Sequence, residues 1–188
     1  MRLFYAVPVA NQLESVYQEF LEFFQKLKKL GSVLKPVERE NLHATILFLG
    51  DKVGLQQSVS SLEGLNVTSF KACFTSMSWF PSKDYIRVLW LGLQPRQGFQ
   101  EMHEKLCNAL GLKPEKRFEP HVTIARVKHL PLKAKTFLKQ NKALIDSKVL
   151  NTCFNVQELV LYNSTLTSKG PLYKVVAKKS FLKASSQD

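Results

Sequence analysis

The segments Asn41-Leu42-His43-Ala44-Thr45-Ile46 and Glu119-Pro120-His121-Val122-Thr123-Ile124 repeat one pattern, in which a histidine precedes a threonine by two residues inside an apolar run. Both runs are typical of β-strands, and side chains two residues apart in a strand point to the same face. Each histidine is therefore expected beside a threonine hydroxyl. Two such strands predict a site with two imidazoles and two hydroxyls.

A histidine on a half-buried strand is often a packed core residue. Here each strand has a separate apolar face to serve the core, made by Leu42, Ala44, Ile46 and Phe48 in the first strand and by Pro120, Val122 and Ile124 in the second. The histidines and threonines are left for the opposite face, which favours a functional site. His103, in a helical stretch, and His129, in a basic loop, lack the pattern, and we interpret both as surface residues.

The elements around the two strands also repeat. In each half of the chain an apolar strand, at residues 2–7 or 86–91, precedes a helix and then the histidine strand. This order predicts an α+β fold of two lobes related by a pseudo-twofold axis. Two antiparallel sheets flanked by helices would enclose the active-site cleft between the lobes. The expected strands are 2–9, 42–49, 70–79, 85–93, 117–127, 148–155, 156–164 and 173–181, and the expected helices are 12–30, 53–62, 96–110 and 131–141.

The composition indicates a single two-lobed domain over residues 1–188, because no linker-like stretch divides the chain. No apolar run approaches the roughly 20 residues of a membrane-spanning helix. The N-terminus is better explained by an opening strand than by a signal peptide. Cys73, Cys107 and Cys153 are scattered and odd in number. We therefore expect three free, buried cysteines and a reducing, cytoplasmic location.

The chain is strongly basic, with 27 Lys and Arg against 15 Asp and Glu and a formal net charge of +12. Such an excess attracts polyanions through contacts with phosphate groups. A basic surface kept for solubility is the alternative. Together with a two-histidine site, the charge favours a nucleic-acid partner.

Two histidines beside two hydroxyls suit acid–base chemistry at a phosphodiester. One imidazole can activate the nucleophile while the other protonates the leaving oxygen, and threonine hydroxyls can donate to the non-bridging oxygens. A 2′,3′-cyclic phosphate is a natural substrate for such a site. A zinc site is the competing interpretation, but neither motif has a carboxylate or cysteine beside its histidine. The sequence also lacks the phosphate-binding loop of nucleotide triphosphatases and the Gly-x-Ser-x-Gly nucleophile elbow.

The paired His-x-Thr strands resemble those of the two-histidine phosphoesterase superfamily, specifically the RNA 2′,3′-cyclic phosphodiesterases, also called 2′-5′ RNA ligases. The resemblance implies a bilobal fold and hydrolysis of the cyclic phosphate to a 2′-phosphate without a metal or other cofactor. It extends along nearly the whole chain. The segments that carry it are Arg2-Leu3-Phe4-Tyr5-Ala6, residues 40–50, Pro120-His121-Val122-Thr123-Ile124-Ala125-Arg126, residues 161–166 and Gly170-Pro171-Leu172-Tyr173.

The resemblance also implies residue roles, which the residues alone leave open. His43 would be the general acid, His121 the general base, and Thr45 and Thr123 the phosphate ligands. Arg126 would add positive charge, although strict strand alternation points it away from His121. Tyr5 occupies a position where a base could stack, and a plain core tyrosine is the equal alternative.

The expected partner is RNA with 2′,3′-cyclic phosphate ends, tRNA fragments included. We expect no membrane partner, and we expect a monomer. Ligation through a 2′-5′ bond at the same site and a non-catalytic RNA-binding module are the alternative functions.

Overall fold

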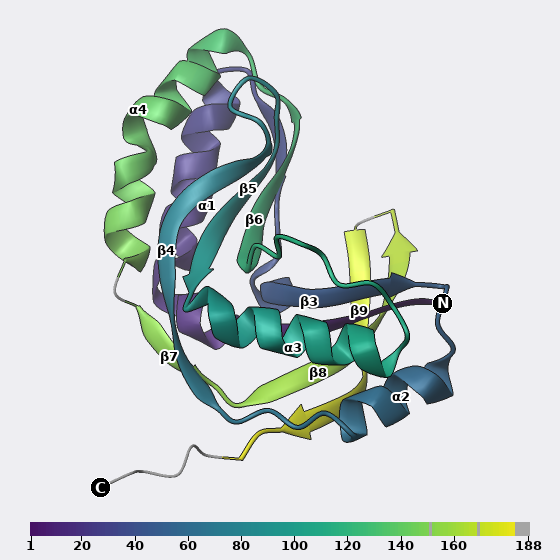
Figure 1. The fold of residues 1–188 in the computed structure, drawn as a ribbon. Helices are drawn as coiled ribbons and strands as arrows, with labels where there is room; N and C mark the ends of the chain where they lie inside the picture. The colour runs from purple at the N-terminus through teal and green to yellow at the C-terminus, as the bar shows by residue number, and fades with distance from the viewer. Residues whose placement is uncertain (151, 169, 183–188) are drawn as a thin grey trace, which may run out of the picture.

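A single antiparallel sheet of nine strands organises the fold (Figure 1). The structure is a computed structural model, and it describes residues 1–150, 152–168 and 170–182. The strand order is β7-β4-β5-β6-β3-β1-β8-β9, and β2 pairs with β6. The strands are β1 (Arg2–Pro8), β2 (Val33–Pro36), β3 (His43–Gly50), β4 (Phe70–Pro81), β5 (Ile86–Gln94), β6 (His121–His129), β7 (Cys153–Val156), β8 (Glu158–Thr167) and β9 (Gly170–Ser180). The helices are α1 (Glu14–Lys29), α2 (Leu55–Glu63), α3 (Arg96–Ala109) and α4 (Leu132–Val149), with short 3-10 turns at Asn11–Leu13 and Arg39–Asn41.

The predicted two-lobed α+β fold is confirmed, and the two predicted sheets are the two halves of this one curled sheet. Between β3 and β6 the backbone pairs only at Ala44 and Val122, so the halves bend away from one another at this junction. Helices α1 and α4 cover the half that contains β4, β5 and β6, whereas α2 and α3 cover the half that contains β3, β1, β8 and β9 (Figure 1). The open face of the curled sheet forms the cleft.

Helix α1 shows why the helices lie where they do. Phe20, Phe23, Phe24 and Leu27 recur at helical spacing and are buried, and the helix ends just before Gly31, which adopts the left-handed conformation (φ 90°). Among the described residues, no helix is long and apolar enough to cross a membrane.

Helix α4 continues eight residues beyond its predicted end at residue 141. Leu138, Ile145 and Val149 are buried along one side, and Lys142 and Asp146 bind the backbone of one residue on β4. Asp146 Oδ1 accepts from Met77 N–H at 2.7 Å, and Lys142 Nζ donates to the Met77 carbonyl at 2.9 Å. These contacts hold β4 where its pairing with β5 shifts register, between Phe74 and Met77.

Two strands begin later than predicted. The strand predicted at 148–155 begins only at Cys153, because α4 extends to Val149, and the strand predicted from residue 117 begins at His121.

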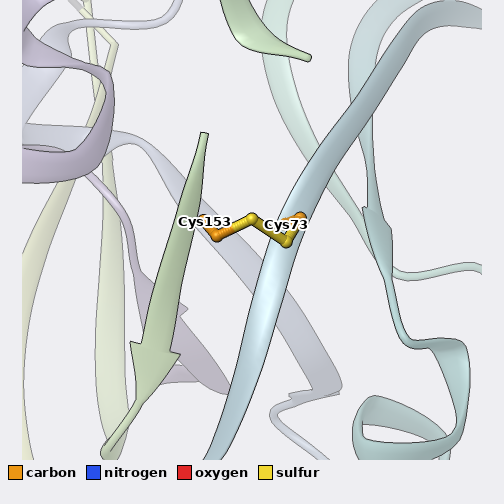
Figure 2. Close-up of a disulfide and its surroundings, with 2 residues drawn as sticks. All are labelled: Cys73 and Cys153. Carbon is orange, nitrogen blue, oxygen red and sulfur yellow. A yellow bond between two sulfur atoms is a disulfide. The ribbon is translucent and has the colours of Figure 1, made fainter. Parts of the chain in front are cut away.

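The expectation of three free cysteines is wrong. Cys73 on β4 and Cys153 on β7 lie opposite one another in adjacent strands and form a disulfide (Figure 2). Only the pairing of β4 with β7 brings together these two residues, which are 80 positions apart in the sequence. Cys107 is free and buried, as predicted.

The interpretation of His103 as a surface residue is also wrong. Its side chain on α3 is buried, with Nδ1–H donating to the Ile46 carbonyl of β3 at 2.8 Å. Its Nε2 accepts from the backbone N–H of Glu115 at 3.0 Å, and its ring stacks on Phe118. Both ring nitrogens of His103 therefore have a hydrogen-bond partner within the core. His129 is exposed, as predicted, although it is the last residue of β6 and does not lie in a loop.

Candidate active site

The two predicted histidines begin the two strands that meet at the centre of the sheet. His43 is the first residue of β3, His121 is the first residue of β6, and the Ala44–Val122 pair lies between them. In this antiparallel pairing His43 lies beside Thr123 and Thr45 lies beside His121. Both histidines and both threonines line one small cavity of about 90 Å³, together with Arg126.

Backbone carbonyls orient the two imidazoles in the same way. His43 Nδ1 lies 2.6 Å from the Asn41 carbonyl oxygen, and His121 Nδ1 lies 2.7 Å from the Glu119 carbonyl oxygen. A carbonyl oxygen can only accept, so each Nδ1 carries the proton and donates it. In both residues Nε2 is left to exchange a proton with a bound molecule.

Aromatic rings pack against each histidine. The His43 ring lies 5.1 Å from Phe4 and 5.3 Å from Tyr173, and the His121 ring lies 5.1 Å from Phe80 and 5.6 Å from Trp90. Burial, and to a lesser degree electrostatic interaction with His121 and Arg126, lowers the pKa of His43 to about 4, although the hydrogen bond to the Asn41 carbonyl acts to raise it. His43 is therefore neutral at neutral pH while no anion occupies the cavity.

A β-bulge turns Arg126 toward the site. Leu89 of β5 pairs with Ala125 and Trp90 pairs with Thr123, so Ile124 has no partner on β5. Ile124 and Ala125 are consecutively buried as a result, and the alternation of faces shifts by one residue. Arg126 consequently lines the same cavity as His121. Strict alternation along the sequence would have pointed it away.

The same bulge occurs in β3 and exposes Phe48, which we expected in the core. Tyr5 of β1 pairs with Leu47 and Ala6 pairs with Thr45, which leaves Ile46 unpaired. Phe48 stands five residues after His43, as Arg126 stands five residues after His121, and its side chain is 56% exposed. At equivalent positions the two bulged strands thus present a cation, on β6, and an aromatic ring, on β3.

A larger hollow adjoins the small cavity on the Phe48 side. It measures about 460 Å³ and shares His43, Thr45 and Arg126 with the small cavity. Its remaining walls come from Phe48, from Arg2 and Phe4 of β1, and from the β8–β9 hairpin. The Arg2 guanidinium lies 5.9 Å from the centre of the Phe48 ring. Hollows of this size accommodate small molecules.

Tyr5 does not take part in the site. Its side chain is fully buried on the helix-covered face of β1, and its hydroxyl donates to the Ser58 carbonyl of α2 at 2.8 Å. Burial raises its pKa to about 12, against the effect of the bond to Ser58. The ring that faces the cleft from β1 is the neighbouring Phe4. Sequence reasoning missed Phe4 and Phe48. The alternation along β1, which places Phe4 on the same face as the charged Arg2, could have identified Phe4.

Within the ranges described, no three His, Cys, Asp or Glu side chains gather closely enough to bind a metal ion. The residues that line the small cavity offer two proton-exchanging nitrogens, two hydroxyl donors and one guanidinium around a space of phosphate size. Such a set can transfer protons on two sides of a phosphorus centre and stabilise its equatorial oxygens.

Comparison with known proteins gives a consistent result. A sequence profile of the 2′-5′ RNA ligase superfamily matches residues 16–166. The RNA 2′,3′-cyclic phosphodiesterase of Methanocaldococcus jannaschii is 36% identical over 181 residues, which cover 94% of this chain and 98% of that protein. The protein of the same name from Thermotoga maritima is 33% identical over 189 residues, which cover 96% of each chain.

Solved structures share the fold over the same length. The crystal structure of TT0787 of Thermus thermophilus aligns with a TM-score of 0.71 at 26% identity, covering 97% of this chain and 99% of that one. E. coli LigT, solved in complex with phosphate, aligns with a TM-score of 0.66 at 22% identity, covering 97% and 98%.

Proposed function

The chain belongs to the 2′-5′ RNA ligase superfamily, and from this membership and the site geometry we propose that it hydrolyses the 2′,3′-cyclic phosphate at the end of an RNA to a 2′-phosphomonoester. Relatives that carry the name RNA 2′,3′-cyclic phosphodiesterase are enzymes, and their likeness extends over nearly all of this chain. The observation that carries the proposal is the symmetric pair of imidazoles, each with Nδ1 bonded to a carbonyl and Nε2 available, around one phosphate-sized cavity.

In the proposed reaction His121 Nε2 takes a proton from water, and the water oxygen attacks phosphorus. The bond from phosphorus to O3′ breaks, and His43 Nε2–H gives its proton to O3′. Thr45 and Thr123 donate to the non-bridging oxygens, and the Arg126 guanidinium offsets their negative charge. These residues perform both proton transfers without a metal.

The acid role requires His43 to hold a proton that it lacks in the free enzyme. An anionic phosphodiester in the cavity supplies the charge that favours the imidazolium, and so raises the His43 pKa from its low value. Substrate binding thus prepares the acid. The low pKa also keeps His43 from carrying a positive charge in the buried site of the free enzyme.

The base of the terminal nucleotide is assigned to the 460 Å³ hollow, against the exposed ring of Phe48. Aromatic stacking holds a base with little dependence on its identity. The hollow and the catalytic cavity share His43, Thr45 and Arg126, so a base and a phosphate of one nucleotide can occupy both.

The test is hydrolysis of adenosine 2′,3′-cyclic phosphate in EDTA, with the product identified by ³¹P NMR. We expect the 2′-phosphate from the wild type, and a loss of about 10²–10⁴-fold in rate for His43→Ala and for His121→Ala. His129→Ala, an exposed histidine at the far end of β6, is the matched control and should retain activity.

Other outcomes would contradict the proposal in separate ways. A 3′-phosphate product would exchange the roles of the two histidines. Joining of RNA halves that bear a cyclic phosphate and a 5′-hydroxyl, without hydrolysis, would establish ligation. RNA binding without any turnover would leave a binding module. Full activity of both histidine variants would refute the acid–base mechanism.

A further inference from the structure

A second hollow, outside the catalytic cavity, opens on the other side of His43. It measures about 590 Å³ and is lined by residues of β1, β7, β8, β9 and the turn before α1. Pro8 of its lining pairs with His43 across β1 and β3. Tyr162 of its lining stacks on Phe4, whose ring also contacts His43. One proline and one aromatic ring therefore connect this hollow to the catalytic site.

The hollow lies on the same face of the sheet as the catalytic histidines. Phe4, Ala6 and Pro8 alternate with the core residues of β1, so they face the cleft. Lys178 pairs with Val160, which in turn pairs with Ala6, so Lys178 faces the cleft as well. The 590 Å³ hollow and the Phe48 hollow thus lie along β1 on opposite sides of the histidine pair.

Four carboxamide side chains distinguish this hollow. Asn11, Gln12, Asn155 and Gln157 all line it, and in the described part of the chain none of them has a side-chain hydrogen bond. A carboxamide offers both donors and an acceptor, which is the chemistry that contacts the edges of nucleobases. The charged side chains of the lining are Lys178 and Glu158, so the cation that could meet a phosphate here has a carboxylate in the same hollow.

The strand that carries Asn155 is held in place. Asn155 lies two residues after Cys153 on the four-residue strand β7, so both side chains project from the same face. The disulfide to Cys73 ties that short strand to β4 (Figure 2). Asn155 is therefore anchored rather than carried by a free edge strand.

We propose that this hollow is a subsite for the nucleotide preceding the cyclic end, so that the enzyme acts on RNA strands in preference to mononucleotides. This inference rests on the proposed function. The carboxamides contact the base of the penultimate nucleotide, and Lys178 contacts the phosphate that links it to the next residue. The terminal base at Phe48 and the preceding nucleotide then extend in opposite directions from the cyclic phosphate.

The experiment compares the kcat/KM of a trinucleotide 2′,3′-cyclic phosphate with that of the mononucleotide. We expect the wild type to favour the trinucleotide by about tenfold, the value of one or two net hydrogen bonds. In the Asn155→Ala, Gln157→Ala double variant this ratio should fall toward one. Gln140→Ala, an exposed carboxamide on α4, is the matched control and should keep the wild-type ratio.

A second measurement tests the assignment of Lys178. Binding of a trinucleotide ending in a 2′-phosphate, followed by fluorescence anisotropy, should weaken with salt. The Lys178→Gln variant should lower the slope of log K against log salt concentration by about 0.7, the value for one phosphate contact on a single strand. An unchanged slope would remove the lysine contact from the proposal.

The two proposals fail in different ways. If the wild type hydrolyses both substrates with equal kcat/KM, or if the double variant keeps the wild-type ratio, the subsite is refuted and the hydrolase stands. If neither substrate is hydrolysed, the proposed function fails. The anisotropy measurement then still decides the subsite, because weaker trinucleotide binding by the double variant supports it and equal binding refutes it.

Discussion

Replacement of His43 by glutamine should make the protein less sensitive to acid. The folded-state pKa of His43 is lowered to about 4 from an ordinary value of 6.5, chiefly by burial and then by electrostatic interaction with His121 and Arg126. The unfolded chain therefore takes up a proton first as the pH falls, which favours unfolding. The stability associated with neutral His43 is fully present above the ordinary pKa and is lost as the pH falls from 6.5 toward 4.

The two pKa values set the size of the effect. Between pH 7 and pH 5, proton uptake by His43 in the unfolded state should lower the free energy of unfolding by about 2 kcal/mol. The glutamine variant lacks this contribution, whereas other titrating groups contribute equally to both proteins. The quantity to compare is therefore the difference between the two pH values, not the stability at either one.

Urea unfolding followed by circular dichroism at both pH values measures this difference. His129→Gln serves as the control, since this histidine is exposed at the end of β6, and it should lose as much stability as the wild type. Parallel losses in the wild type and in His43→Gln would refute the reasoning. They would show that His43 titrates alike in the folded and unfolded states, and that substrate binding has no low pKa to raise.

Three further predictions concern other parts of the molecule. Phe48→Ala should raise the KM for adenosine 2′,3′-cyclic phosphate by about 5- to 150-fold, whereas Phe48→Trp should retain it; equal KM values in steady-state kinetics would exclude stacking. Asp146→Ala should lower the free energy of unfolding by about 2 kcal/mol, because it leaves the Met77 N–H without its charged acceptor; an unchanged urea midpoint would contradict this. Cys73→Ser should lower the free energy of unfolding by about 4.5 kcal/mol, the chain-entropy estimate for closing a loop of 80 residues, and thiol reduction of the wild type should have the same effect if the disulfide is responsible.

The fold could be predicted from the sequence because its evidence is local. Apolar periodicity marked the strands and helices, and the repeated His-x-Thr motif showed which two strands meet at the site. The end of α4 could not be predicted in the same way. Residues after 141 are held in the helix by burial of Ile145 and Val149 and by the contacts of Lys142 and Asp146 with Met77, and these depend on the tertiary structure.

The errors at the site have a common physical cause. A prediction by strand parity assumes unbroken alternation, and a single bulge in each strand reverses it after Ile46 and Ile124. Phe48 was therefore placed in the core, and Arg126 was expected to point away. The Cys73–Cys153 pair was missed for another reason, because its formation depends on which strands become neighbours.

The two bulged strands carry different residues at equivalent positions, Phe48 on β3 and Arg126 on β6. This difference has a consequence for regiochemistry. Two identical His-x-Thr halves would bind a cyclic phosphate equally well in either orientation of the ribose. By themselves they therefore cannot distinguish the 2′ ester oxygen from the 3′ ester oxygen. Phe48 and Arg126 occupy equivalent places on the two strands, and under the proposed function Phe48 stacks on the base while Arg126 supplies a charge. A ribose whose base rests on Phe48 has one orientation left, and a single ester oxygen then faces His43.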